Sequence, residues 1–242
     1  MSNGGYKGNT PARETSPEQY PGVWELTEQF QAQADGNWPF QETDCAPKSL
    51  RFDGSSAYLS RTPSVAGNRK TWTWSGWLKR SALGAGQIIF ETQNGSAGTP
   101  RATLELTSGD LLALSANEDG SSWKTVSGNN VLRDTAAWYH LVVALDTTQA
   151  TASDRLKLYI NGAEVSYNAT NYPNQNANLP INQSLGHRIG SGSNNSVYLN
   201  GYLADVHFID GQALTPDAFT FIDGQGILQP KRFTGDYASG PV

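Results

Sequence analysis

The chain has 242 residues, of which 37% are hydrophobic and only 16% are charged, and it contains 25 glycines. This composition is typical of short strands joined by many turns. The formal net charge is −5 and acidic and basic residues are interspersed, so the sequence lacks the basic cluster that marks a nucleic-acid-binding protein. We also expect no secretory signal peptide and no membrane-spanning segment, because no apolar run of the required length is present.

Residues 1–47 differ in composition from the rest of the chain and predict a docking arm. The first part of the arm is polar and indicates an extended segment. From Gly22 to Ala34, apolar side chains recur at helical spacing, which predicts a short amphipathic helix. A helix of this length is not stable alone, so we expect it to dock on another surface. The predicted docking residues are Val23, Trp24, Leu26, Phe30, Trp38 and Phe40.

From Ser49 onward, short segments of alternating apolar and polar residues predict β-strands. The clearest is Leu156–Val165, in which the alternation leads directly into Asn161-Gly162. This dipeptide tolerates positive φ at both positions, as a tight type I′ hairpin turn requires. The other predicted strands are 49–53, 57–60, 70–79, 87–92, 101–106, 110–116, 123–126, 138–145, 187–190 and 199–209.

The order of these strands makes the prediction more specific. We expect the strands 49–53 and 57–60 to pair with each other, and the strand 101–106 to pair with 110–116. Residues 168–185 are rich in Asn and Pro and predict a long surface loop. In the last strand, simple alternation predicts that Tyr202, Ala204, Val206 and Phe208 share one face and that Asp205 and His207 share the other.

About a dozen short strands at roughly ten-residue spacing indicate an all-β sandwich of two antiparallel sheets. The predicted strand 70–79 carries three tryptophans: Trp72 and Trp74 share a face and are expected in the core, and Trp77 lies on the opposite face. After the last strand, Leu214–Phe219 predicts one helical turn that Thr215 would cap.

Several of these segments, in this order, carry a family resemblance. They are Leu50-Arg-Phe-Asp-Gly54, Trp74-Ser-Gly-Trp-Leu78, Trp138-Tyr-His-Leu-Val142, Leu156–Val165 and Gly201-Tyr-Leu-Ala-Asp-Val-His-Phe208. The set resembles the concanavalin A-like lectin/glucanase superfamily in its laminin G-like branch. The resemblance implies a jelly-roll sandwich over residues 48–222, between the docking arm 1–47 and an extended C-terminal tail, 223–242.

A second resemblance covers the two ends of the chain. Tyr20-Pro-Gly-Val-Trp-Glu-Leu26 and Gln229-Pro-Lys-Arg-Phe-Thr-Gly-Asp-Tyr237 are similar to segments of marine bacteriophage virion proteins. This resemblance implies a virion structural protein, assembled in the host cytoplasm, that acts as a tail fibre, an appendage or a capsid decoration. Its expected partners are other virion proteins and further copies of itself.

The sequence argues against an enzyme. Glucanases of the superfamily carry Glu-x-Asp-x-x-Glu, which places paired carboxylates on one face of a strand, and this chain has no such motif. His140 lies in an apolar strand and is expected to be packed. His187 and His207 do not have the spacing of zinc ligands. We therefore expect no catalytic residues and no cofactor.

Sugar-binding sites combine aromatic faces with hydrogen-bonding side chains. Trp123 and Tyr172 are the candidate stacking residues, although the same loops can also be plain solvated turns with Trp123 packed. Calcium is a further option, held by Asp119 with Asn117, or by Asp53. The candidate polar ligand-binding residues are Asn94, Asn117, Asp119 and Asn194.

Three functional hypotheses remain open from the sequence. In the first, the arm docks on the particle and the sandwich binds a host-surface glycan. In the second, the protein is a purely structural cement or decoration subunit that binds no glycan. In the third, it is a free carbohydrate-binding lectin.

Overall fold

The computed structural model describes residues 48–94, 100–117 and 123–238 of the chain. The predicted docking arm and its helix fall outside these ranges and stay predictions. Also outside them are the docking residues Val23, Trp24, Leu26, Phe30, Trp38 and Phe40 and the candidate calcium ligand Asp119.

The chain divides into two compact units. The first, which we call the sandwich unit, comprises Lys48–Phe219 and the chain from Phe233 onward. The described residues of the second unit are Thr220–Arg232. They form a hairpin of two antiparallel strands, β14 (Thr220–Ile222) and β15 (Leu228–Pro230).

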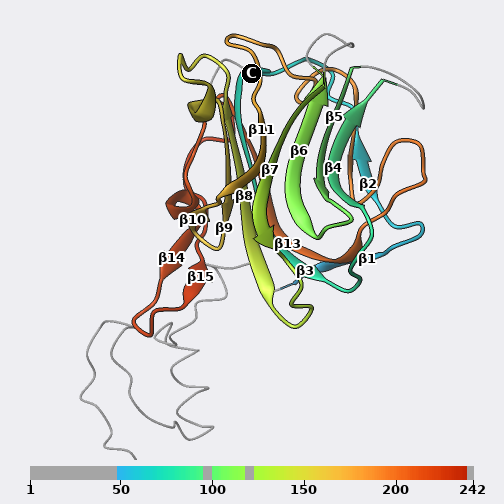
Figure 1. Cartoon of the computed structure of the whole chain (residues 1–242), viewed down its shortest axis with the longest axis vertical. Helices are drawn as coiled ribbons and strands as arrows, with labels where there is room; N and C mark the ends of the chain where they lie inside the picture. The colour runs from blue at the N-terminus through green and yellow to red at the C-terminus, as the bar shows by residue number, and fades with distance from the viewer. Residues whose placement is uncertain (1–47, 95–99, 118–122, 239–242) are drawn as a thin grey trace, which may run out of the picture. The chain divides into compact units, whose positions relative to one another are not determined.

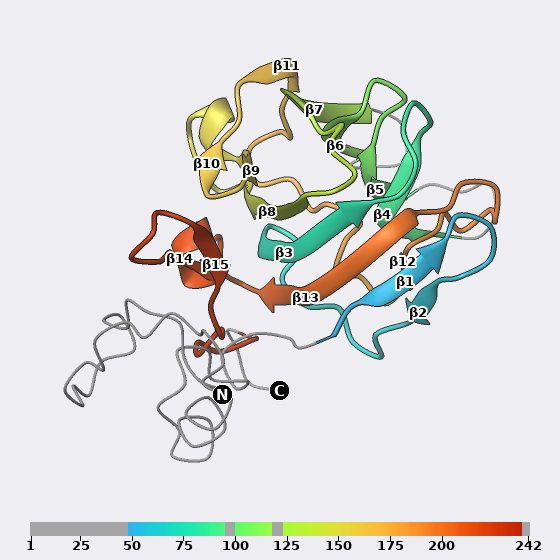
Figure 2. The ribbon, with the colours of Figure 1, turned by 90° about the horizontal axis from the view of Figure 1, so that it is seen from below.

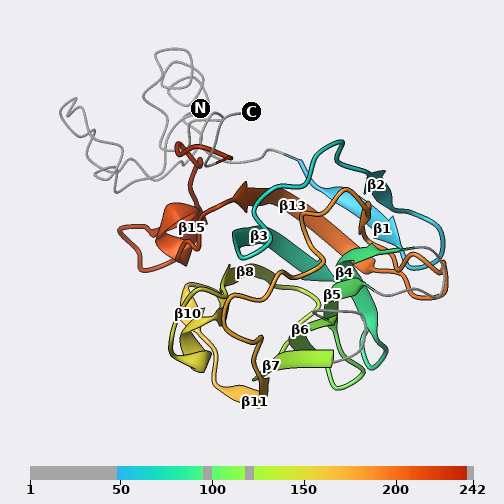
Figure 3. The same cartoon turned by 90° about the horizontal axis from the view of Figure 1, so that it is seen from above.

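The sandwich unit consists of two antiparallel sheets that lie face to face (Figure 1). Figures 2 and 3 view these layers from their two ends, with β3, β8 and β13 in one layer and β4 to β7 in the other. The six-stranded sheet contains, in spatial order, β1 (Leu50–Asp53), β13 (Asn200–Asp210), β3 (Thr71–Arg80), β8 (Trp138–Asp146), β9 (Leu156–Ile160) and β10 (Ala163–Glu164).

The seven-stranded sheet carries the candidate site described below. Two short 3₁₀ helices, η1 (Ala152–Asp154) and η2 (Pro216–Ala218), lie in connections. The spatial order of the strands is β11 (Tyr167–Asn171), β7 (Trp123–Val131), β6 (Leu111–Asn117), β5 (Arg101–Leu106), β4 (Gln87–Gln93), β12 (Gly186–Ile189) and β2 (Leu59–Arg61).

The predicted all-β sandwich of antiparallel sheets is confirmed, and so are its clearest local features. Asn161 and Gly162 have φ values of 51° and 83° and join β9 to β10, as the type I′ turn requires. The strands β5 and β6 pair through their short turn, as predicted.

The core lies between the inner faces of the two sheets. Its members are mainly branched aliphatic and aromatic side chains that alternate along each strand, including Trp72, Trp74, Leu104, Leu141 and Leu158, all at most 1% exposed. Burying one such side chain contributes about 1.5–3 kcal/mol. The predicted core positions of Trp72 and Trp74 are therefore confirmed.

The predicted pairing of the first two strands is wrong. β1 pairs with β13 and β2 pairs with β12, so the two strands belong to different sheets. The turn between them is closed by Asp53, whose Oδ1 accepts the N–H groups of Ser55, Ser56 and Ala57. This turn carries the chain across the edge of the sandwich instead of back along the same sheet.

A β-bulge in β13 overturns the predicted alternation of that strand. Asp205 and Val206 together face Gly76 of β3, and Asp205 has a φ of 49°. The extra residue reverses the pattern along the strand. Leu203, Val206 and Phe208 face the core, whereas Tyr202 and Ala204 lie on the outer side.

The segment predicted as a long surface loop is partly structural. Tyr167–Asn171 forms the edge strand β11. Further along, Leu179 and Ile181 are fully buried in the core. The predicted helical turn is present as η2, but the side chain of Thr215 makes no capping hydrogen bond to the backbone.

The outer face of the six-stranded sheet is covered by the chain that follows β13. Phe219 is fully buried, and its ring stacks on that of Phe233 with centroids 5.3 Å apart. On the same face, His207 Nδ1 and the Tyr237 hydroxyl share a hydrogen bond of 2.8 Å. This face is thus closed by apolar and aromatic side chains of the same unit.

Candidate ligand-binding site

The outer face of the seven-stranded sheet is polar along β4 and β5. Phe90 and Leu104 point into the core, so their neighbours Glu91 and Thr103 point outward. Across the other edge of β4, Arg188 of β12 lies opposite Glu91. The register of three strands therefore brings charged and hydroxyl side chains together on one face.

Glu91 organises this face although it is fully buried. Arg101 donates to its Oε2 from Nε at 3.0 Å and from Nη2 at 2.7 Å, and Thr103 donates to the same oxygen at 3.2 Å. The backbone N–H and the hydroxyl of Ser193 donate to Oε1 at 2.6 and 2.7 Å. The carboxylate thus neutralises Arg101 and holds the loop after β12 against the sheet.

Gly192 permits the close approach of that loop. A Cβ at this position would lie 2.9 Å from Ile88 Cδ1 and 3.1 Å from Asn194 Oδ1. A side chain at this position would therefore require the side chains of Ile88 and Asn194, or the loop itself, to shift.

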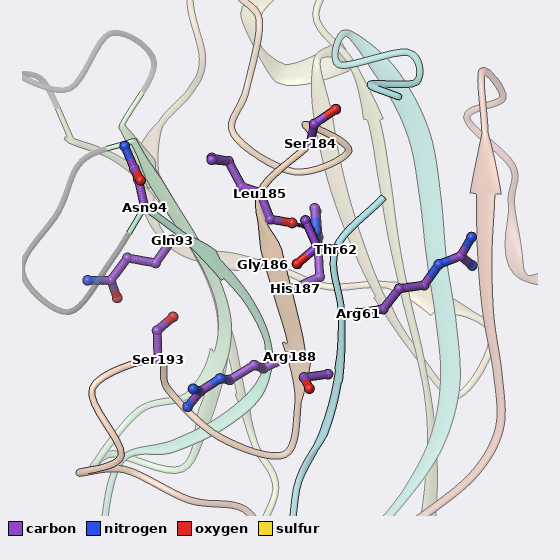
Figure 4. Close-up of a pocket in the computed structure, with 11 residues that line it drawn as sticks. Arg61, Thr62, Gln93, Asn94, Ser184, Leu185, Gly186, His187, Arg188 and Ser193 are labelled. Atoms are coloured by element: carbon purple, nitrogen blue, oxygen red, sulfur yellow. Dashed lines mark hydrogen bonds between the residues drawn. The ribbon is translucent and has the colours of Figure 1, made fainter. Parts of the chain in front are cut away.

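A pocket of about 570 Å³ opens beside this loop, and we call it the β4–β12 pocket. Figure 4 shows Gln93, Asn94 and Ser193 on one side of it, with Arg188 pointing toward Ser193. Its volume lies within the usual range for small-molecule sites. The lining residues are Ser60, Arg61, Thr62, Gln93, Asn94, Ser184, Leu185, Gly186, His187, Arg188 and Ser193.

The position of Arg188 is fixed on two sides. Its Nη1 donates to the carbonyl oxygen of Gly192 at 3.0 Å and to Asn195 Oδ1 at 2.5 Å. Its guanidinium carbon lies 4.5 Å from the centre of the Tyr58 ring, within the range of a cation–π contact.

His187 supports the pocket from the inner side. Its Nδ1 donates to the carbonyl oxygen of Leu185 at 2.8 Å, and its Nε2 accepts the N–H of Asn182 at 3.0 Å. Its ring stacks on Phe90. Burial lowers the pKa of His187, so the neutral ring that this bonding pattern requires is also the favoured form.

The structure separates the residues that the sequence proposed for ligand binding. Asn94 lines the β4–β12 pocket, and Asn194 lies in the loop above it, where its Oδ1 accepts the N–H of Ser196. Tyr172 packs on the core beside the ring of Tyr167, next to β11 at the opposite edge of the sheet.

Two further candidates lie away from the pocket. Asn117 is buried and its Oδ1 accepts the N–H of Arg101. Trp123 begins β7, opposite Asn117, and two strands separate β7 from β4. The structure therefore does not bring Trp123 and Tyr172 together with Asn94.

Sequence reasoning missed Arg188 and two hydroxyl groups, that of Ser60 on β2 and that of Thr62 directly after it. A signal for Arg188 was present, because it is a charged residue between His187 and Ile189, which both point into the sandwich. The contribution of β2 had no local signal, since it depends on pairing with a strand more than a hundred residues away.

Asp53 does not fit the role of a calcium ligand. Its Oδ1 accepts three backbone N–H groups and its Oδ2 accepts the hydroxyl of Ser56. These donors hold the pKa of Asp53 well below its usual range and occupy the oxygens that an ion would need. Within the described ranges, no three or more His, Cys, Asp or Glu side chains are grouped to hold a metal ion.

The described part of the chain contains no helix with the length and apolar character needed to cross a membrane. No curated protein sequence matches the chain. The laminin G-like model described as "Concanavalin A-like lectin/glucanases superfamily" matches residues 53–218. The chain belongs to this superfamily.

Solved structures with similar folds include three from different organisms. The pentraxin of Limulus polyphemus is 18% identical, with 69% of this chain and 77% of that chain covered and a TM-score of 0.49. A Ruminococcus gnavus sialidase carbohydrate-binding module, bound to α2,3-sialyllactose, is 14% identical, with 71% and 95% covered and a TM-score of 0.49. Domains LG4-5 of the mouse laminin α1 chain are 15% identical, with 81% and 48% covered and a TM-score of 0.47. Similarity at this level assigns no ligand to this chain.

Proposed function

We propose that the protein is a non-enzymatic structural protein of a bacteriophage virion whose sandwich binds a glycan in the β4–β12 pocket. The observation that carries the glycan-binding role is the lining of this pocket, which includes four hydroxyl and two amide side chains, those of Ser60, Thr62, Ser184, Ser193, Gln93 and Asn94. Sugars present hydroxyls that both donate and accept hydrogen bonds, and such groups complement them. Gln93 lies on β4, which is paired on both sides, and Ser193 is held by two hydrogen bonds to Glu91, so these two groups are in place before the ligand arrives.

The virion role is supported by the resemblance of both chain ends to phage virion proteins. In this proposal the arm, residues 1–47, docks on neighbouring virion subunits and the sandwich faces outward. A tail fibre, an appendage and a capsid decoration all satisfy this arrangement. Many copies on one particle convert a weak affinity for a sugar into useful avidity.

The absence of catalysis is supported by the state of Glu91. Its carboxylate accepts five hydrogen bonds from Arg101, Thr103 and Ser193 and is fully buried. A carboxylate held in this way is not available to attack a glycosidic carbon. Its role in the proposal is to position the pocket.

A glycan array with the full chain tests the glycan-binding role. We expect the wild type to bind, and we expect the double variant Gln93→Ala/Asn94→Ala to lose most of the signal. Asn130→Ala, an exposed asparagine on β7, is the matched control and should bind normally. Absence of binding by the wild type across the array would favour a purely structural cement subunit.

Deletion of residues 1–47 tests the virion role. The shortened chain should keep the fold of the sandwich but fail to enter particles. Normal incorporation would contradict the docking arm, and a protein absent from purified particles would instead favour a free lectin.

A further inference from the structure

Arg188 carries a positive charge that no carboxylate pairs within the described ranges. Both hydrogens of its Nη1 are used by Gly192 and Asn195, but its Nε and Nη2 make no hydrogen bond to a described residue. The described ion pairs do not include Arg188. A guanidinium with this edge free is an unused bidentate donor.

The charges around Arg188 do not cancel it. Glu91 lies opposite Arg188 on β4, but its two oxygens already accept from Arg101, Thr103 and Ser193. The side chains that line the pocket include two arginines, Arg61 and Arg188, and none of them is acidic. This local excess stands out in a chain whose net charge is −5.

The free edge of Arg188 is also held in place. The Tyr58 ring supports one face of the guanidinium, and the two acceptors on Nη1 fix its rotation. Arginine recognises carboxylates best when two parallel N–H groups are presented together. Because the side chain is already ordered, less conformational entropy is lost when an anion binds.

We propose that the ligand of the β4–β12 pocket is an acidic sugar, whose carboxylate binds the Nε and Nη2 edge of Arg188. The sugar hydroxyls are then bound by the neighbouring polar groups of Gln93, Asn94 and Ser193. This inference rests on the proposed glycan-binding function and specifies the class of glycan.

The test is titration calorimetry of the full chain with matched sugars. The probes are oligosaccharides that end in glucuronic, galacturonic or sialic acid, each compared with its methyl ester, which removes the charge but keeps the ring. We expect at least one acid to bind, and its ester to bind about tenfold to a hundredfold more weakly, the factor expected for loss of one charged hydrogen-bonded pair.

Three variants test whether Arg188 is the residue that distinguishes the acid from its ester. Arg188→Gln should weaken binding of the acid to the level of its ester. The affinity of Arg188→Lys for the acid should lie between those of the wild type and Arg188→Gln, because lysine keeps the charge but not the bidentate edge. Arg51→Gln is the matched control, because it removes a guanidinium that also lies over a tyrosine ring, that of Tyr202, but on β1 of the six-stranded sheet, outside the pocket. It should bind the acid normally, and thermal unfolding should confirm that all three variants are folded.

The outcomes separate this inference from the function on which it rests. Equal binding of acid and ester, or of wild type and Arg188→Gln, would overturn the acidic-sugar assignment and leave glycan binding intact. Binding of no sugar at all would overturn both. Competition by inorganic sulfate as strong as that of the acidic sugar would show a general anion site and would also overturn the assignment to a sugar.

Discussion

The two outer faces of the sandwich are built by the same alternation but serve different purposes. On the six-stranded sheet, Phe219 and Phe233 of the same unit cover the face and bury it in aromatic contacts. On the seven-stranded sheet, Glu91 accepts two hydrogen bonds from Ser193 and so holds the loop after β12 beside β4, next to the polar β4–β12 pocket. One face is thus closed by the chain itself, and the other leaves the polar pocket that we propose as the ligand site.

This comparison predicts that variants of the closed face change stability alone. Phe219→Ala should lower the free energy of unfolding by about 4 kcal/mol, because a fully buried ring is replaced by a cavity. Phe221→Ala is the matched control, since Phe221 is 48% exposed and should cost less than about 0.5 kcal/mol. Urea unfolding measures both, and a loss of glycan binding by folded Phe219→Ala would break the separation of the two faces.

The second-largest effect is expected at low pH, which should destabilise the closed face of the six-stranded sheet. His140 is hydrogen-bonded to Ser75 on this face, and burial lowers its pKa from 6.5 to about 4; among its titratable neighbours, Asp205 opposes this shift and His207 adds to it. Because the fold favours the neutral ring, its contribution is complete above pH 6.5 and is lost as the pH falls from 6.5 toward 4. The full loss is roughly 3 kcal/mol.

Urea unfolding between pH 7 and pH 4 tests this dependence. His187, whose pKa is also lowered, acts in the same direction, so the wild type should lose more than His140 alone contributes. His140→Gln keeps a hydrogen-bonding group and should flatten the dependence. A variant with the same slope as the wild type would show that His140 does not titrate as described.

Variants on the outer face of the seven-stranded sheet should affect glycan binding more than stability. Glu91→Gln removes the charge that binds Arg101 and Ser193, and should cost about 2 kcal/mol while abolishing glycan binding, because the loop that positions Ser193 is released. Glu105→Gln is the control on the same face, since burial raises the pKa of Glu105 and a neutral side chain suits that site better. Full glycan binding by Glu91→Gln would show that Glu91 is not needed to position the pocket.

The smallest expected effect on stability belongs to Arg188→Gln. The Arg188 side chain is half-buried and makes two hydrogen bonds and a cation–π contact, so Arg188→Gln should lower the free energy of unfolding by about 1 kcal/mol, in addition to weakening glycan binding. A large destabilisation in urea would mean that Arg188 holds the fold together and is not kept for a ligand.

The features predicted well from the sequence are those set by neighbouring residues. The turn at Asn161-Gly162 depends on two residues that accept positive φ, and the core positions of Trp72 and Trp74 follow from alternation in a single strand. The bulge at Asp205 escaped prediction because Tyr202–Phe208 is equally compatible with unbroken alternation. Only the pairing with Gly76 of β3 shows where the extra residue lies.

The candidate site was predictable only in part, because it is assembled from distant segments. Asn94 was identified from its polar loop, but the pocket also needs Thr62 after β2 and Arg188 of β12. These come together through strand pairing across the sheet, which carries no local sequence signal. The rival stacking residue Tyr172 looked suitable as an aromatic in a polar loop, yet its ring packs on the core.

The most direct test of the account is an NMR titration of the ¹⁵N-labelled full chain with the best glycan from the array. The account predicts that the largest shifts of backbone amides fall on Gln93, Gly186–Arg188 and Ser193, around the β4–β12 pocket. Shifts centred on Trp123 and Tyr172, at the other end of the seven-stranded sheet, would contradict it.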